Sequence, residues 1–197
     1  MERIIKIALA GRKYSGKDEF AELFEELGFH IFSFSDQLKR IATNLFPFMK
    51  KDYTSKEKES LVVYTNPDTG VEYTPRDIWQ ALDLLPEIYP PVFVESMSNE
   101  VLNLAAKKRQ VLKRCVKDVR RPAELEWIKQ NNFYLLYIDT DDPRSTNEKS
   151  QHKSESFQKM IRDSADRTYC NIKGQENWQQ RMMVEVLEVI ENAKEQW

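Results

Sequence analysis

The sequence predicts an α/β fold in which one doubly wound, parallel, five-stranded sheet carries helices on both faces. Short apolar segments typical of buried strands alternate with longer segments whose apolar residues recur at helical spacing. Strands that are joined through helices need crossover connections, and such connections make parallel sheets. At 197 residues the chain has room for one domain, so we expect residues 1–197 to form a single domain.

Five short segments are expected to be strands, because each is mostly apolar or bounded by turn residues: 4–10, 29–34, 111–118, 133–138 and 168–172. The third of these is the least apolar, since Lys113, Arg114 and Lys117 interrupt it. Gly11 ends the first strand. The fourth is the most uniformly apolar and is therefore the clearest strand of the set.

Seven segments with apolar residues at helical spacing are expected to be helices: 17–27, 36–46, 75–85, 92–107, 122–130, 154–165 and 175–196. Gly28 would stop the first helix, and Ser35 or Asp36 would cap the second. Pro75 would begin the third, because proline is favoured at the first helical position. Residues 47–73 are polar and turn-rich, so we expect an irregular loop there.

The composition excludes several classes of function. A formal net charge of -2 disfavours bulk attraction to nucleic acid, and no apolar run approaches the roughly 20 residues that span a bilayer. Two distant cysteines favour a reducing cytoplasm, and two histidines without a Cys/His cluster give no basis for a zinc site. We therefore expect no nucleic-acid or membrane partner, and the sequence leaves open whether the chain forms a homodimer.

The segment GRKYSGKD follows the first strand and fits the phosphate-loop pattern G-x-x-x-x-G-K-[ST] except at its last position. Gly11 and Gly16 would let successive backbone N–H groups face one anion, and Lys17 would add a positive charge at the start of a helix. The ATP-binding candidates are Gly11, Lys13, Ser15, Gly16, Lys17 and Asp18. The ordinary alternative is a strand-to-helix turn with an incidental lysine.

Asp18 stands where the pattern has a hydroxyl residue. Its carboxylate could hold Mg²⁺ directly or through a water molecule. It also places a negative charge close to the expected phosphates, which a metal ion or nearby cations would have to offset. Besides Lys17, which is assigned to the phosphates, Arg12 and Lys13 are the nearest candidates to offset this charge.

The string SGKD, followed by a helix and then FSFSDQLKR, resembles the bacteriophage deoxynucleoside monophosphate kinases. The same SGKD loop occurs in animal phosphomevalonate kinases, which share the fold. The resemblance implies a P-loop NTPase-like fold with ATP and Mg²⁺ as cofactors. It also implies that Asp36, Lys39 and Arg40 lie beside the acceptor substrate.

The segment CVKDVRRPAELEWI is similar to the family's D-x-R-x-x-x-E segment. The resemblance implies that Asp118 binds Mg²⁺ through water, that Arg120 grips a phosphate and contributes to catalysis, and that both residues contact the acceptor. Both residues follow an expected strand, and ligands bind at the carboxyl ends of parallel strands. The ordinary alternative is a cluster of surface salt bridges.

The segment TPRDIWQALD resembles the family's T-x-R-x-x-x-Q-x-L segment, with Asp83 in place of a glycine. By this resemblance Arg76 and Gln80 bind the acceptor, and residues of about 36–107 form an acceptor-binding helical region. An amphipathic helix is the alternative. Trp79 and the long insert at 47–73 suggest a base to stack on, which favours a nucleotide acceptor.

The polar segment 140–153 is expected to be a mobile lid, because it has little to bury by itself. The string HKSE resembles an H-x-S-E element of the family, and Arg144 lies where these kinases keep a catalytic lid arginine. His152 is either catalytic or part of a helix N-terminus that Ser154 caps. Asn171, in a loosely similar last strand, is implied to lie near the adenine.

These motifs occur in the family's order from residue 5 to about 174. They predict ATP-dependent phosphoryl transfer to a nucleoside monophosphate, which the resemblance suggests is a deoxynucleotide. A related kinase of phosphomevalonate or dephospho-coenzyme A is one alternative. A regulator that binds nucleotides without transferring phosphate is another.

Overall fold

A computed structural model describes residues 4–107, 112–146, 157–172 and 174–195 of the chain. The chain divides into two compact units: Met1–Ser33 with Ser98–Trp197, and Phe34–Met97. The first unit contains the sheet. The second covers most of the region expected to bind the acceptor.

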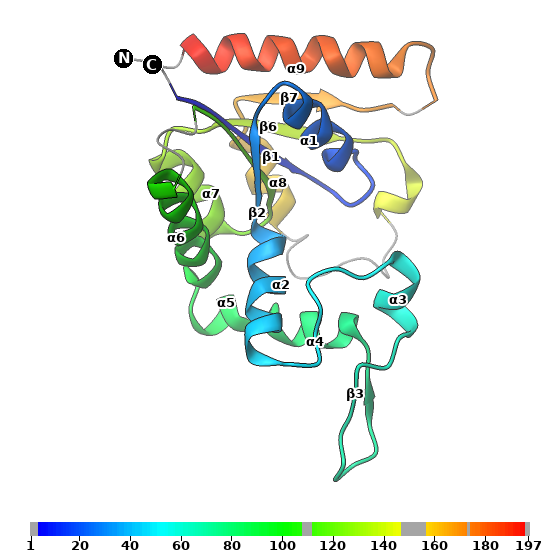
Figure 1. Ribbon diagram of the computed structural model, residues 1–197. Coiled ribbons are helices and arrows are strands. Elements are labelled where there is room, and N and C mark those ends of the chain that lie inside the picture. Colours follow the sequence, from blue (N-terminus) through cyan, green and yellow to red (C-terminus); the bar gives the residue numbers. More distant parts are fainter. Residues whose placement is uncertain (1–3, 108–111, 147–156, 173, 196–197) are drawn as a thin grey trace. The chain divides into compact units, whose positions relative to one another are not determined.

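The first unit is built on a five-stranded parallel sheet, as the sequence predicted (Figure 1). The strands lie in the order β2-β5-β1-β6-β7. Their bounds differ from the expected ones by no more than two residues at either end: β1 (Ile5–Gly11), β2 (His30–Ser33), β5 (Lys113–Val119), β6 (Tyr134–Asp139) and β7 (Arg167–Cys170). The central strand, β1, therefore has its carboxyl end between those of β5 and β6.

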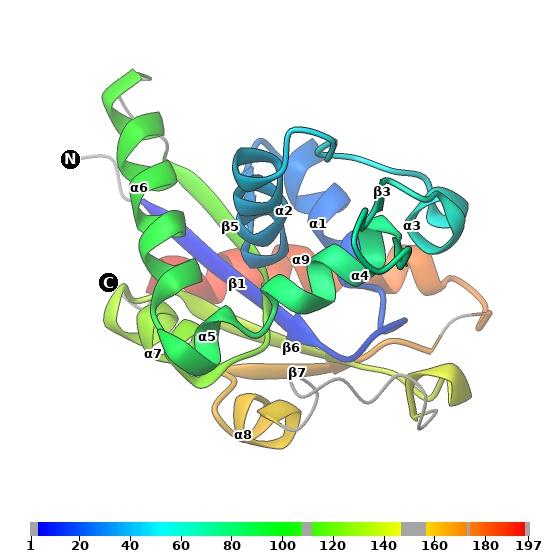
Figure 2. The same cartoon turned by 90° about the horizontal axis from the view of Figure 1, so that it is seen from below.

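Helices cover both faces of this sheet. On one face, α1 (Lys17–Glu26) lies over β1, β2 and β5, and α9 (Trp178–Glu195) lies over β1 and β6, while α7 (Pro122–Gln130) and α8 (Gln158–Asp163) lie on the other face (Figures 1 and 2). The first face has a core to which strands and helices both contribute: Ile7, Leu9, Phe20, Phe24, Leu136, Met182 and Val186. Because β1 is buried on both faces, its sequence is almost continuously apolar.

The strand β5 contains a bulge close to its carboxyl end. Ala8 of β1 pairs with Val116, but Ala10 pairs with Val119, so β5 holds one extra residue between the two pairs. Asp118 lies within this bulge and has a φ of 65°, in the left-handed region that side chains rarely adopt. The bulge changes the direction of the chain where β5 leaves the sheet.

The second unit is mainly helical and has its own small core. Its elements are α2 (Phe34–Leu45), α3 (Ser55–Ser60), β3 (Tyr64–Thr65), β4 (Glu72–Tyr73), α4 (Pro75–Leu82), α5 (Leu85–Ile88) and the start of α6 (Val92–Lys107). Buried side chains from α2, the following turn and α4 meet in the core: Ala42, Met49, Tyr53, Ile78, Trp79 and Leu82. Trp79 is 9% exposed and packs edge-on against Tyr53, so it is a core residue and not a platform for a base.

The expectation of an irregular, turn-rich loop at 47–73 was only partly right, because the segment also contains α3, β3 and β4. A capping box between Thr54 and Glu57 begins α3. Farther along, the Asn66 side chain accepts hydrogen bonds from the N–H groups of Asp68 and Thr69, which closes the turn between β3 and β4. The rings of Phe48 and Tyr64 stack 5.0 Å apart and support this hairpin.

Two helix boundaries in the second unit also differ from expectation. The helix α2 begins at Phe34, so neither Ser35 nor Asp36 is its cap. The segment expected as one helix at 75–85 is divided, because α4 ends at Leu82 and α5 begins at Leu85. The Thr74 hydroxyl accepts a hydrogen bond from the N–H of Asp77 and caps α4 ahead of Pro75, as the proline predicted.

Both cysteines are free thiols; Cys115 is buried, while Cys170 is exposed. Burial raises the pKa of the Cys115 thiol. In the described part of the chain, no helix is both long enough and apolar enough to cross a bilayer.

Candidate phosphate-binding site

The loop between β1 and α1 depends on its two glycines. Gly11 has a φ of 144°, and a Cβ atom added there would lie 2.2 Å from the carbonyl oxygen of Ile138 on β6. Gly16 has a φ of 95°, and its Cβ would lie 2.3 Å from Nδ2 of Asn171. Side chains are therefore excluded at both positions by sterics and by backbone conformation. The motif that the sequence suggested adopts a tight turn that only glycine permits at these two places.

Lys17 is the first residue of α1, and its side chain folds back over the loop. Its Nζ donates hydrogen bonds to the carbonyl oxygens of Gly11 at 2.8 Å and Arg12 at 2.6 Å. The residue is only 8% exposed. The N-cap of α1 is Gly16, which has no side chain to close the helix N-terminus. A buried ammonium group and a helix N-terminus therefore lie at the same loop, which is the combination that binds phosphate in proteins.

Asn171, just after β7, holds the loop from the other side. Its Nδ2 donates a 2.9 Å hydrogen bond to the carbonyl oxygen of Ser15, and its backbone N–H donates to the carbonyl oxygen of Asp139. Because a peptide unit is planar and trans, fixing the Ser15 carbonyl toward Asn171 directs the Gly16 N–H the opposite way. The family resemblance implied that Asn171 lies near the adenine, which stays a prediction. Its side chain lies against the loop backbone.

Two buried polar atoms at this contact have no hydrogen-bond partner among the described residues: Oγ of Ser15 and Oδ1 of Asn171. Both residues are almost completely buried. Buried groups of this kind are costly unless a partner is supplied. Ser15 is therefore part of the loop's interior, with its hydroxyl beside Gly11.

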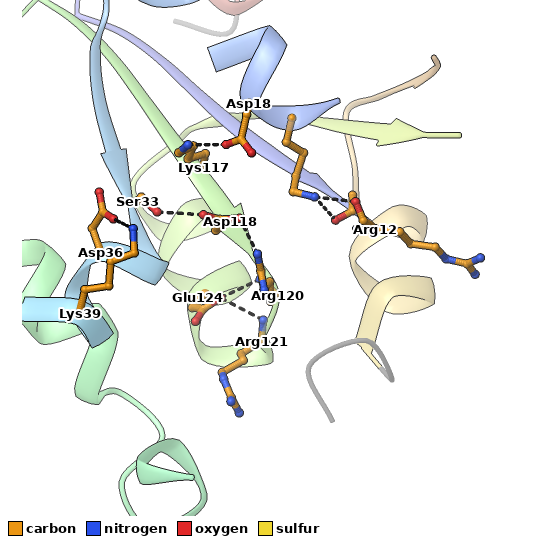
Figure 3. A network of polar contacts seen from close by, with 12 residues as sticks. Arg12, Asp18, Ser33, Asp36, Lys39, Lys117, Asp118, Arg120, Arg121 and Glu124 are labelled. Carbon is orange, nitrogen blue, oxygen red and sulfur yellow. Dashed lines mark hydrogen bonds and ion pairs between the residues drawn. The ribbon is translucent and has the colours of Figure 1, made fainter. Parts of the chain in front are cut away.

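Asp18 points to solvent and pairs with a lysine that the sequence did not select. Its Oδ1 lies 2.5 Å from Nζ of Lys117 on β5, and the two side chains are 76% and 23% exposed, respectively. Figure 3 shows this contact beside the start of α1. Lys113, Arg114 and Lys117 looked like interruptions of a strand. Only the parallel pairing of β5 with β1 brings Lys117 to the loop.

Asp118 occupies the bulge at the end of β5 and is nearly buried. Its Oδ2 accepts a 2.9 Å hydrogen bond from Oγ of Ser33, and its Oδ1 accepts a 2.7 Å bond from Nη2 of Arg120 (Figure 3). A left-handed backbone at a non-glycine residue is strained, and such strain clusters at functional sites. The structure thus brings together Asp118 and Arg120, the two residues that the sequence selected here.

Glu124 on α7 closes the turn after β5. Its Oε2 accepts hydrogen bonds from the N–H groups of Arg120 at 2.7 Å and Arg121 at 3.0 Å, and the residue is only 4% exposed. Burial raises the pKa of Glu124 to about 7, while the two N–H groups and the two arginines oppose the shift. The sequence motif contained Glu124 without a role for it. Its position three residues after Arg121 is the capping spacing that could have indicated one.

Asp139, at the end of β6, was missed by the sequence analysis. Its Oδ2 lies 3.0 Å from Nη1 of Arg162 on α8, and its Oδ1 accepts a hydrogen bond from the N–H of Thr140. An acidic residue directly after a buried parallel strand is the signal that could have found it. Gly11 pairs with Ile138, so Asp139 is next to the loop in the sheet.

The residues selected as acceptor contacts on α2 and α4 all belong to the second unit. Nζ of Lys39 lies 2.6 Å from Oδ1 of Asp36 (Figure 3), and Arg40 is partly buried on the same helix. On α4, Nε and Nη2 of Arg76 both bond Oε1 of Glu59, and Gln80 is exposed. These are ionic and polar groups on helices, and their contact with an acceptor stays a prediction.

The expected lid is described only in its first half. Residues 140–146 include the short 3-10 helix η1 (Pro143–Thr146), which contains the backbone of Arg144. Residues 147–153 and His152, Ser154 and Glu155 lie outside the described part of the chain. The expected lid motion and the roles of Arg144 and His152 stay predictions.

Compared with protein-family models and with curated proteins, the sequence matches none at a significant level. The structure itself is α/β, with helices on both faces of an all-parallel sheet and a glycine loop after the first strand, consistent with a P-loop NTPase-like fold.

The donor atoms around the loop suit Mg²⁺ held together with phosphate. Asp118 and Asp139 bring carboxylate oxygens to the ends of β5 and β6, Asp18 brings them to the first turn of α1, and oxygen is the ligand that Mg²⁺ prefers. Among the described residues, no group of three or more His, Cys, Asp or Glu side chains could hold a metal ion by itself. Mg²⁺ usually keeps several waters and binds through one or two carboxylates plus substrate phosphates, so such a sparse set is compatible with it.

Proposed function

We propose that the chain is an ATP-dependent kinase that transfers a phosphoryl group to a nucleoside monophosphate, with deoxynucleotides as the first candidates. One observation carries the proposal. A glycine loop with a buried lysine lies at the carboxyl end of the central parallel strand, where such sheets bind ligands. Phosphoryl transfer needs positioning and charge stabilisation more than covalent chemistry from the protein.

In this proposal Lys17 and the loop amides hold the donor phosphates. Asp18 and Asp118 would hold Mg²⁺, in part through water; ATP would supply the transferred phosphoryl group, and Mg²⁺ would offset the negative charge of its phosphates. Arg120 and Arg144 stabilise the transferring group. The acceptor contacts are assigned to Asp36, Lys39, Arg40, Arg76 and Gln80 of the second unit.

The choice of acceptor rests on the sequence resemblance, because Trp79 is buried in a core and gives no support for a stacked base. A kinase of phosphomevalonate or dephospho-coenzyme A would use the same loop. We place the reaction in a reducing cytoplasm, which is consistent with two cysteines that are both free.

A screen for ADP release tests the proposal directly. The protein would be incubated with Mg²⁺-ATP and, separately, with each nucleoside monophosphate, phosphomevalonate and dephospho-coenzyme A. We expect release with at least one nucleoside monophosphate, and a loss of about a hundredfold or more in the Lys17→Ala variant. Lys6→Ala is the matched control, because Lys6 lies on β1, the strand that leads into the loop, and its Nζ donates a hydrogen bond to the carbonyl oxygen of Asn131 and not to the loop. Melting temperatures of both variants check the fold.

Two results would contradict the proposal. One is full turnover in Lys17→Ala, because the loop would then play no part in transfer. The other is nucleotide binding without ADP release for any acceptor. That result would favour a regulator that binds nucleotides, which the pairing of Asp18 with Lys117 already allows, since the carboxylate is engaged by a side chain.

A further inference from the structure

An ion pair joins the start of α1 to the end of β5. Oδ1 of Asp18 lies 2.5 Å from Nζ of Lys117, and 99 positions of the sequence separate the two residues. Asp18 follows Lys17 directly, at the position where phosphate loops have a hydroxyl residue. The pair therefore lies at the one place where this loop departs from the usual pattern.

Stability does not explain this pair. The Asp18 side chain is 76% exposed, and exposed ion pairs contribute little to stability because water and salt screen them. The electrostatic problem at this position is different. A carboxylate beside a phosphate loop repels the phosphates that the loop is shaped to bind.

Arg12 and Lys13, the other basic residues of the loop, do not solve that problem. Nζ of Lys13 lies 5.0 Å from the centre of the Tyr14 ring, and the Arg12 guanidinium extends away from Asp18 (Figure 3). Lys117 faces the carboxylate directly (Figure 3). The sequence could not single it out, because it lies far along the chain among other basic residues of the same strand.

We propose that Lys117 is a charge-balancing residue of the phosphate site, which neutralises Asp18 and so allows an aspartate to replace the usual hydroxyl residue. This inference rests on the proposed function of the loop. If the inference is right, the charges of the two residues cancel. The net charge of the site is then the same in the wild type and in a variant in which both residues are neutral. Replacing either one alone shifts the charge by one unit, in opposite directions.

Four proteins test the inference by binding alone: the wild type, Lys117→Met, Asp18→Ser and the double variant. The ligand is ADP with EDTA present, measured by calorimetry at low salt, so that neither Mg²⁺ nor turnover contributes. We expect Lys117→Met to bind about tenfold more weakly than the wild type and Asp18→Ser to bind more tightly. The double variant should return to within about threefold of the wild type. All differences should shrink at about 0.5 M salt.

Lys113→Met is the matched control. Lys113 lies at the opposite end of the same strand and its Nζ bonds the carbonyl oxygen of Leu27, so the variant removes the same charge away from the loop. We expect its ADP affinity to stay within about twofold of the wild type and all melting temperatures to stay close together.

Two outcomes would overturn the inference while leaving the proposed function intact. One is equal ADP affinity in the wild type and Lys117→Met. The other is weaker binding in both single variants without recovery in the double variant, which is the pattern of a purely structural contact. Absence of ADP binding by the wild type would overturn the proposed function, and the inference with it.

Discussion

The two sides of the candidate site are held in place by different kinds of force. The loop between β1 and α1 is fixed by glycine conformations and by hydrogen bonds from Lys17 and Asn171 to backbone carbonyls. The turn at the end of β5 is fixed mainly by charged side chains. Asp118 bonds Arg120, and Glu124 accepts from two backbone N–H groups.

The conformation of the loop therefore depends mainly on steric fit, whereas the conformation of the β5 turn depends on the ionisation of its side chains. Steric constraints and hydrogen bonds that are accepted by neutral backbone carbonyls depend less on pH and salt than contacts in which a carboxylate takes part. The loop should therefore respond to changes in side-chain volume. The β5 turn should respond to changes in protonation and ionic strength.

The largest effect is expected for Gly11→Ala. The new Cβ would lie 2.2 Å from the backbone oxygen of Ile138, which cannot move without disturbing the pairing of β1 with β6. We expect the free energy of unfolding to fall by roughly 3 kcal/mol or more, from overpacking and backbone strain together. Chemical denaturation measures it.

Gly28→Ala is the control for this prediction. Gly28 also has a positive φ, of 84°, but a Cβ there would meet nothing within 4 Å. The expected cost is about 1–2 kcal/mol, from the conformation alone. Equal losses in the two variants would show that the contact with Ile138 does not constrain the loop.

A smaller effect, which depends on pH, is expected at the β5 turn. Burial raises the pKa of Glu124 from an ordinary value near 4.5 to about 7. The folded state therefore binds this proton more tightly than the unfolded chain does, and the stabilisation is fully present below about pH 4.5. It is lost as the pH rises toward 7, and the shift corresponds to about 3 kcal/mol.

The comparison with Glu124→Gln isolates this contribution. The amide oxygen can still accept from Arg120 and Arg121, but the side chain does not titrate. Denaturation at several values between pH 5 and 8 should show the wild type losing stability relative to Glu124→Gln as the pH rises. A constant difference across this range would exclude titration of Glu124 in the folded protein.

The smallest effect is expected for Asn171→Ala, which removes the hydrogen bond to the carbonyl oxygen of Ser15. The loss should be about 1–2 kcal/mol, because one buried acceptor is left without its partner. We expect faster hydrogen exchange at the amides of residues 12–16 and unchanged exchange at residues 118–121. Equally faster exchange in both segments would mean that the two sides of the site are coupled and are not held in place independently.

The sequence predicted the sheet well and the second unit less well, for physical reasons. Strands buried on both faces need continuous apolar runs, which are visible in a single sequence. The hairpin of β3 and β4 has two residues in each strand and is supported by rings such as Phe48 and Tyr64, so no long periodic pattern marks it.

In the candidate site, the sequence analysis identified residues that lie close together in the sequence, but it missed contacts between residues that are far apart in the sequence. The glycines, Lys17, Asp118 and Arg120 belong to short motifs, and the structure shows their contacts. Lys117 meets Asp18, and Asn171 meets Ser15, only because β5 and β7 end at the same edge of the sheet as β1. A short sequence motif does not predict the order of strands in the sheet, and it is this order that brings such residues together.

The central position of β1 has a consequence for how the chain folds. Ile5 pairs with Lys113, and Ile7 pairs with Tyr134. During synthesis, the apolar strand IKIALAG must therefore wait for more than a hundred later residues before either neighbour exists. Closing such long loops makes folding slow, and an unpaired apolar strand is prone to aggregate in the meantime. The strand that leads into the candidate phosphate loop is thus exposed without a partner for much of synthesis.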